Sequence, residues 1–215
     1  MMYPIAGHTM GTPEYTVCEA IELLHKMGAD GIEIVVQDAY KSGLPTHCSR
    51  EILEQVKQCA QDNHIQIICL TPYNSYFNSL DEAVRQKELA AIEDVIGYCD
   101  FLGAKYIRIY GGNLVAGDTE KLEERWAKLV ESLRYLGDKA AAKGVTLVVE
   151  NHFNTMAVSA KQSAKLMEDV NHPAVRILYD QANLAFTGNE DYVQAIQTQQ
   201  QYVLKDISEM LDSYE

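Results

Sequence analysis

The chain has 215 residues, of which 47% are hydrophobic and 23% are charged, values that are ordinary for a globular protein. Its 31 acidic and 18 basic residues give a net charge of −13 at pH 7. Such a charge opposes binding to nucleic acid, which depends on lysine and arginine side chains that neutralise phosphates. We therefore expect no nucleic-acid partner.

The five cysteines are scattered along the chain and odd in number, a pattern typical of free thiols in a reducing compartment. The first residues lack the basic and then apolar pattern of a signal peptide. No apolar run approaches the roughly 20 residues that a membrane span requires. The sequence thus predicts a cytoplasmic protein without a membrane partner.

Short apolar runs alternate with longer amphipathic stretches along the chain. The apolar runs predict seven strands, at residues 3–7, 31–36, 65–70, 106–110, 146–151, 175–180 and 202–205. Helical spacing of apolar residues, polar N-caps and glycine stops predict helices at residues 13–27, 49–62, 81–102, 118–143, 159–170 and 191–199.

This alternation continues without a linker rich in proline, glycine or serine, which favours a single α/β domain over residues 1–215 with parallel strands. Seven units fit a TIM (β/α)-barrel better than an open sheet, although an eight-unit barrel needs roughly 200 to 250 residues. We expect a barrel that lacks its eighth βα unit. An open barrel exposes a strand edge and part of its core, which favours a homo-oligomer.

Three charged residues lie inside predicted strands. Glu33, Arg108 and Arg176 each stand between two aliphatic residues. Because side chains alternate along a strand, each charge lies on the face opposite its aliphatic neighbours and is predicted to point into the barrel. We expect a paired interior network that joins Glu33 to an arginine. Glu33 could also reach a substrate hydroxyl.

Two acids stand where buried strands end. Glu150 directly follows the apolar run 146–149, and Asp180 directly follows the run 175–179. Active sites of parallel barrels lie at this end of the strands. Two carboxylates suit Mn²⁺ or Mg²⁺, and Zn²⁺ when a histidine joins them. A bound metal would polarise a carbonyl while the catalytic Glu150 removes the neighbouring proton. The alternative is that Glu150 pairs with a lysine or caps a helix.

Other residues near strand ends are candidate contacts to a small-molecule substrate. Together with the interior Glu33, they are His8, Tyr73, His152, Asn183 and Lys205.

At these positions the sequence resembles the xylose isomerase-like TIM barrels, specifically the sugar phosphate isomerase/epimerase family. The resemblance rests on five segments in order: GADGIEI at Gly28–Ile34, AKYIRIYGG at Ala104–Gly112, GVTLVVENH at Gly144–His152, VRILYDQANL at Val175–Leu184 and YVLKD at Tyr202–Asp206.

The resemblance implies a metal site with four ligands, of which this sequence retains two. The family's first glutamate and its aspartate correspond to Glu150 and Asp180. The position of its histidine is occupied here by Val203, and its second glutamate belongs to an eighth strand that is absent from this sequence. We therefore expect a divalent metal that is bound more weakly than in the family.

The leading interpretation is a metal-dependent isomerase or epimerase of a small sugar or sugar derivative. A second is a truncated or degenerate member that binds a ligand or a partner subunit without full catalysis. A third is a dehydratase of the inosose type, since its first step is also removal of a proton next to a carbonyl. An abasic-site endonuclease on the same barrel is disfavoured by the −13 charge and by the lack of histidines after His172.

Overall fold

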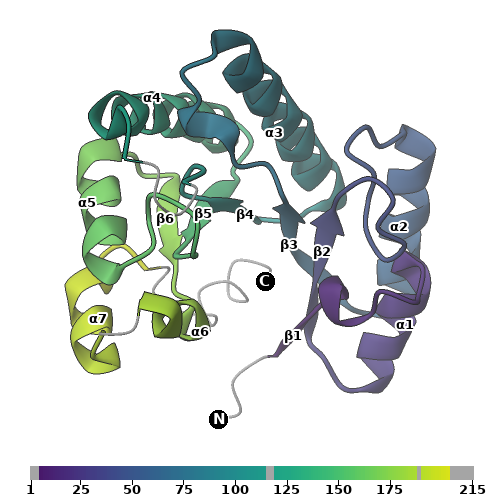
Figure 1. Cartoon of the computed structure of the whole chain (residues 1–215). Coiled ribbons are helices and arrows are strands. Elements are labelled where there is room, and N and C mark those ends of the chain that lie inside the picture. The colour runs from purple at the N-terminus through teal and green to yellow at the C-terminus, as the bar shows by residue number, and fades with distance from the viewer. Residues whose placement is uncertain (1–4, 115–118, 188–189, 204–215) are drawn as a thin grey trace.

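The computed structural model describes residues 5–114, 119–187 and 190–203 of the chain. Within them, six parallel strands form one sheet in sequence order. The strands are β1 (Ala6–His8), β2 (Gly31–Val36), β3 (Gln66–Pro72), β4 (Tyr106–Tyr110), β5 (Thr146–Glu150) and β6 (Val175–Leu178). Figure 1 shows that the sheet curves around a common centre, with helices outside it.

In the described ranges one α-helix follows each of the first five strands, and two follow β6. These helices are α1 (Val17–Lys26), α2 (Arg50–Asp62), α3 (Glu82–Leu102), α4 (Leu122–Ala141), α5 (Ala160–Val170), α6 (Gln181–Leu184) and α7 (Tyr192–Gln199). This arrangement confirms the predicted barrel architecture. In the described residues, no helix is both long enough and apolar enough to cross a membrane.

A seventh strand position begins where the sequence predicts it. Val203 forms an isolated parallel bridge with Ile177, and the Ile177 amide donates to the carbonyl of Tyr202 at 2.9 Å. The chain therefore enters the sheet edge beside β6. The rest of the predicted seventh strand, with Lys205, lies outside the described residues.

Some predicted boundaries were wrong. The first helix begins at Val17 because Thr16 and Glu19 form a capping box, four residues after the predicted start at Pro13. The fourth helix begins at Leu122, and the short helix α6 was not predicted. By contrast, Ser49 and Ser159 cap α2 and α5 where the sequence places their starts.

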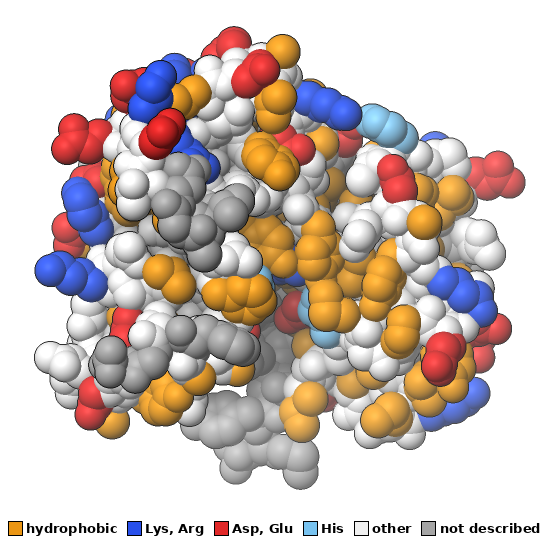
Figure 2. Space-filling model, in the orientation of Figure 1, with side chains coloured by type: hydrophobic (Ala, Val, Ile, Leu, Met, Phe, Trp, Pro, Cys, Tyr) orange, Lys and Arg blue, Asp and Glu red, His pale blue; other side chains and the backbone are white. Residues whose placement is uncertain are grey.

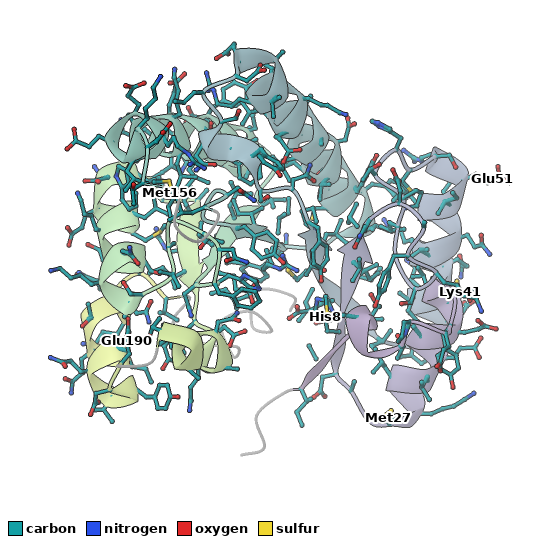
Figure 3. All side chains as sticks on the ribbon, viewed as in Figure 1. His8, Met27, Lys41, Glu51, Met156 and Glu190 are labelled. Carbon is teal, nitrogen blue, oxygen red and sulfur yellow. The ribbon has the colours of Figure 1, made fainter. Side chains whose placement is uncertain are left out.

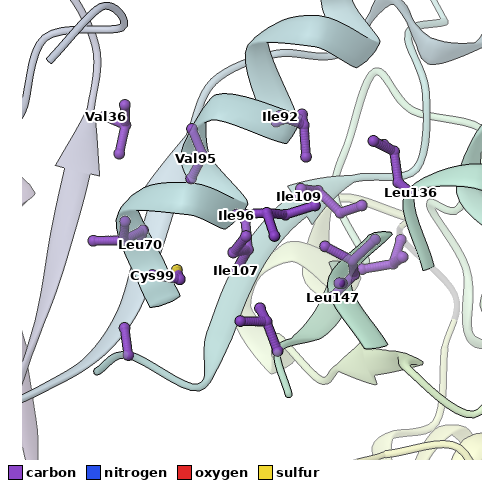
Figure 4. Close-up of a cluster of buried hydrophobic side chains, with 14 of the residues drawn as sticks. Val36, Leu70, Ile92, Val95, Ile96, Cys99, Ile107, Ile109, Leu136 and Leu147 are labelled. Carbon is purple, nitrogen blue, oxygen red and sulfur yellow. The ribbon is translucent and has the colours of Figure 1, made fainter. Parts of the chain in front are cut away.

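The main core lies between the sheet and the helices that cover it. Figure 4 shows Ile107, Ile109 and Leu147 of the strands beside side chains of α3 and α4, among them Ile96 and Leu136. Because these aliphatic side chains face the helices, the alternate strand residues face the barrel axis. The predicted inward direction of Arg108 is thereby confirmed.

A second, smaller cluster fills the barrel interior. Ile68, Cys69, Tyr106 and Val148 are all buried and pack together, with the half-buried Leu178 against them. Leu178 also lines a pocket that opens at the carboxyl ends of the strands, so this apolar cluster borders that pocket from inside the barrel.

Two glycines provide a matched test of this packing. A Cβ at Gly111, just after β4, would lie 2.6 Å from the Cβ of Ala157, whereas a Cβ at Gly97 in α3 meets nothing within 4 Å. We expect Gly111→Ala to destabilise the protein by about 1–3 kcal/mol through overpacking. Gly97→Ala should stabilise it by about 0.5–1 kcal/mol because alanine favours helix. Urea unfolding of both variants measures the difference, and equal stabilities would contradict the packing described.

Candidate functional site

A pocket of about 570 Å³ opens at the carboxyl ends of the strands. Figure 2 shows it as a hollow in the middle of this face, with hydrophobic side chains around it and acidic and histidine side chains inside. Its lining residues come from all six strands or the loops after them: His8, Met10, Gly11, Glu33, Tyr73, Arg108, Tyr110, Glu150, His152, Leu178, Asp180 and Asn183.

Arg108 of β4 is the only lysine or arginine among the described residues that line the pocket. Its Nε lies 3.4 Å from Oε2 of Glu150, and one terminal nitrogen donates to the carbonyl of Pro72 at 3.3 Å. The guanidinium carbon lies 4.7 Å and 4.6 Å from the ring centroids of Tyr73 and Tyr110. Two rings, an acid and a carbonyl thus fix the orientation of this cation.

Asn183 connects the two strand-end acids. Its Nδ2 donates to Oε1 of Glu150 and to Oδ2 of Asp180, both at 3.0 Å. Asp180 is also the N-cap of α6, because its Oδ1 accepts from the backbone N–H of Asn183 at 3.0 Å. The first turn of this short helix therefore places the Asn183 amide against both carboxylates.

Asn151 holds the ends of β5 and β6 together. Its side-chain amide donates to the Asp180 carbonyl at 2.7 Å, and its side-chain oxygen accepts from the Asp180 amide at 2.8 Å. Asn151 is fully buried, so this pair of bonds fixes the backbone of Asp180 next to Glu150. Sequence reasoning did not single out Asn151.

His152 belongs to a series of aromatic rings on one wall of the pocket. Its ring centroid lies 4.8 Å from that of Tyr110 and 4.1 Å from that of the exposed Phe153. Tyr73 extends the series, 6.0 Å from Tyr110. Nδ1 of His152 lies 2.7 Å from the Phe153 carbonyl, so this nitrogen faces a backbone acceptor and not the two acids.

His8 and Glu33 lie on the first two strands of the sheet. Figure 3 shows His8 on the inner side of the strands, whereas Lys41 and Glu51 lie outside. Nδ1 of His8 accepts from the Met10 amide at 3.0 Å, and Nε2 lies 4.0 Å from Oε2 of Glu33. Because Nδ1 is an acceptor, the proton of the neutral ring is on Nε2, on the side of Glu33.

Burial shifts the titration of these groups. It raises the pKa of Glu150 to about 7, an effect that Arg108 opposes and Asp180 reinforces. Burial also raises the pKa of Glu33 and lowers the pKa of His8 to about 4, with the charge of Arg108 adding to the effect on His8. Perturbed carboxyl groups gathered in one cleft are a mark of functional sites.

Most of the predicted site residues meet in this pocket. The structure brings together His8, Glu33, Tyr73, Glu150, His152, Asp180 and Asn183, while Lys205 lies outside the described residues. We expected Glu33 to pair with an arginine inside the barrel. In the structure the arginine of the pocket, Arg108, forms its ion pair with Glu150 on the adjacent strand. Tyr110 was missed as a site residue, although it shares the inward face of β4 with Arg108.

The donor atoms fit a hard cation better than a zinc ion. Glu150 and Asp180 each direct one carboxylate oxygen at Asn183, whose amide also carries an oxygen. Oxygen ligands of this kind suit Mg²⁺ or Mn²⁺. Among the residues that the structure describes, no group of three or more histidine, cysteine and acidic side chains could hold a metal. An oxygen site here therefore depends on an amide or on other ligands besides the two acids.

The low pKa of His8 predicts how stability depends on pH. The unfolded chain takes up this proton near pH 6.5 and the folded protein only near pH 4, so protonation between these values favours unfolding. The free energy of unfolding of the wild type should therefore fall by about 2 kcal/mol between pH 7 and pH 5 through this histidine. The His8→Gln variant should not show this part of the decrease. Urea unfolding at both pH values tests this.

The matched control is His47→Gln, which removes a ring whose side chain is 86% exposed. The prediction fails if His8→Gln and the control show the same pH dependence as the wild type.

The sequence and the fold of this protein are similar to those of several known proteins. Inosose dehydratase from Geobacillus thermodenitrificans is 34% identical over 110 residues, which cover 45% of this chain and 37% of that protein. The match thus spans little more than a third of the curated relative. The 3-keto-D-glucoside 4-epimerase from E. coli superposes with a TM-score of 0.78 at 17% identity, over 94% of this chain and 77% of that one.

A protein from Mycobacterium smegmatis, described as a xylose isomerase-like TIM barrel in complex with magnesium, superposes with a TM-score of 0.75 at 19% identity. The superposition covers 94% of this chain and 72% of that one. The family model for xylose isomerase-like TIM barrels matches residues 21–208, which is most of the chain. This chain therefore belongs to the xylose isomerase-like TIM barrel family.

Proposed function

We propose that this protein is a cytoplasmic, divalent-metal-dependent isomerase or epimerase of a small sugar or sugar derivative, and that it removes a proton next to a carbonyl. The observation that carries the proposal is the position of Glu150, a buried carboxyl at the carboxyl end of β5 in the central pocket, whose pKa burial raises to about 7 before any cation binds. A general base is most effective when its pKa lies near the working pH.

The surroundings of Glu150 suit proton transfer. Oε2 is held by Arg108 and Oε1 by Asn183, so the carboxyl has one orientation toward the pocket. Burial keeps the carboxylate poorly solvated and therefore basic. Proton removal leaves negative charge on the substrate, and the fixed guanidinium of Arg108 lies in the same pocket to stabilise it.

Glu150 and Asp180 are the residues we propose to hold a divalent cation, Mn²⁺ or Mg²⁺ in preference to Zn²⁺. When bound, such a cation supplies Lewis-acid polarisation of a carbonyl or hydroxyl oxygen. The magnesium complex of the structurally similar barrel supports this assignment by analogy.

The remaining pocket residues suit a small polyhydroxy substrate. Tyr73, Tyr110 and His152 form an aromatic wall against which the apolar face of a sugar ring can pack. Glu33 can form hydrogen bonds with substrate hydroxyl groups, and the neutral His8 can donate to them through Nε2. We also retain Lys205 as a proposed substrate contact, on the sequence pattern alone.

A dehydratase is the second candidate, favoured by the sequence similarity to inosose dehydratase. Both reactions begin with proton removal next to a carbonyl. They differ in the second step, since a dehydratase must protonate a departing hydroxyl group. The protonated form of Glu33, favoured by burial, can supply that proton.

Exchange of substrate protons in D₂O tests the step that both candidates share. The protein is incubated with Mn²⁺ and a panel of ketohexoses, keto-glucosides and ketoinositols, and deuterium at the carbon next to the carbonyl is followed by NMR. We expect exchange with at least one compound. An epimer or isomer among the products identifies the first candidate, and a conjugated enone, detected by its ultraviolet absorbance, identifies the dehydratase.

Glu150→Gln should lower this exchange by at least about 10³-fold, because the amide cannot accept the proton. The control is Glu51→Gln, an exposed acid on α2 outside the pocket, which should exchange as the wild type does. Unchanged exchange in Glu150→Gln would refute the role of Glu150. Ligand binding without any exchange would instead support a binding subunit without catalysis.

A further inference from the structure

The two strand-end acids are each anchored through one oxygen. Oε2 of Glu150 faces Nε of Arg108 at 3.4 Å, and Oδ1 of Asp180 accepts from the backbone N–H of Asn183 at 3.0 Å. Both donors are fixed, since Arg108 is 5% exposed and the Asn183 amide belongs to the first turn of α6. Fixed partners of this kind orient metal-binding carboxylates in proteins.

The other oxygen of each acid points at one and the same atom. Oε1 of Glu150 and Oδ2 of Asp180 both lie 3.0 Å from the end of the Asn183 side chain. Asn183 is 7% exposed and lines the pocket. The polar ends of the Glu150, Asp180 and Asn183 side chains therefore meet in the pocket at the carboxyl ends of the strands.

These separations are ordinary hydrogen-bond lengths, and they are also compatible with the edges of a small octahedral site. Mg²⁺ binds oxygen at about 2.0–2.1 Å, so two adjacent ligands at right angles lie about 2.8–3.0 Å apart. The two edges that the end of Asn183 makes with the acids have this length. The larger Ca²⁺, with oxygen ligands at 2.3–2.6 Å, requires wider spacing.

The Asn183 amide has two ends of nearly equal size. In the orientation described here its NH₂ group donates to both acids, which offsets their mutual repulsion. A half-turn about the Cβ–Cγ bond places Oδ1 where Nδ2 stands, without moving the backbone. The same side chain can thus serve either as a donor to the acids or as a third oxygen ligand beside them.

We propose that Asn183 is a ligand of the divalent cation, through Oδ1, together with Glu150 and Asp180. The inference rests on the metal dependence proposed above and names the residue that completes a three-oxygen face. Val203, which enters the sheet edge beside β6, offers no side-chain donor atom. Oδ1 of Asn183 can supply the ligand that the side chain of Val203 cannot, because the first turn of α6 places the Asn183 side chain beside both acids.

Binding of Mn²⁺ to the full chain tests this inference without reference to any substrate. Affinities are measured by titration calorimetry and by the paramagnetic resonance of free Mn²⁺, for wild type, Asn183→Ala and Asn183→Asp. We expect Asn183→Ala to weaken Mn²⁺ binding at least about tenfold, because it removes the third oxygen. Asn183→Asp keeps an oxygen at the same place and adds charge, so it should bind at least as tightly as the wild type.

Asn63→Ala, at the end of α2, is the matched control and should bind Mn²⁺ like the wild type. Circular dichroism and the melting temperature without metal confirm that each variant folds.

Wild-type affinity in Asn183→Ala would overturn the inference while leaving metal dependence intact. Equal weakening in Asn183→Asp and Asn183→Ala would also overturn it, because the NH₂ group would then be what matters. If the wild type binds no Mn²⁺, both the inference and the proposed metal dependence fail, whereas the D₂O exchange experiment still tests Glu150 separately.

Discussion

The candidate site depends on the ion pair between Arg108 and Glu150 inside the barrel. The pocket gathers three carboxyl groups, those of Glu33, Glu150 and Asp180, with one lysine or arginine among its described lining residues. A buried carboxylate without a partner is costly, and the guanidinium offsets part of that cost. Because β4 and β5 are adjacent and parallel, Arg108 and Glu150 approach each other from neighbouring strands. Tyr73 and Tyr110 then restrict the guanidinium, so the direction of the Glu150 carboxyl depends on aromatic packing as well.

The strands and their inward faces could be predicted because they follow from local pattern. Alternation of aliphatic and charged residues in β4 places Arg108 inside, and the apolar runs before Glu150 and Asp180 end at the rim. The partner of Arg108 could not be predicted in this way. Period-2 alternation fixes a face but not the stagger between strands, and the register of β2 on β3 shifts between Ile32 and Glu33. In the structure Glu33 faces His8 at 4.0 Å, and the ion pair of Arg108 is with Glu150.

The role of Asn183 shows a second limit of sequence patterns. Asp180 and Asn183 are three residues apart, a spacing that brings an N-cap and the third residue of a helix together. The sequence signal was present, but a helix of four residues is too short for its periodicity to be recognised. Sequence reasoning therefore treated Asn183 only as a substrate contact. In the structure it also bonds to both acids, and Asn151 fixes the backbone on which this geometry depends.

The wall formed by His8 and Glu33 is where the two candidate reactions would diverge. In both proposed reactions the base would be Glu150, so the base would not select between them. The low pKa of His8 keeps its ring neutral at pH 7, with its proton directed at Glu33. Burial raises the pKa of Glu33, which makes its carboxyl the group of this wall best suited to donate a proton. A proton returned to carbon gives an epimer or isomer, whereas a proton given to a hydroxyl group gives elimination. Under this proposal the position of the substrate relative to Glu33, set by the aromatic wall, would decide the outcome more than the identity of the base.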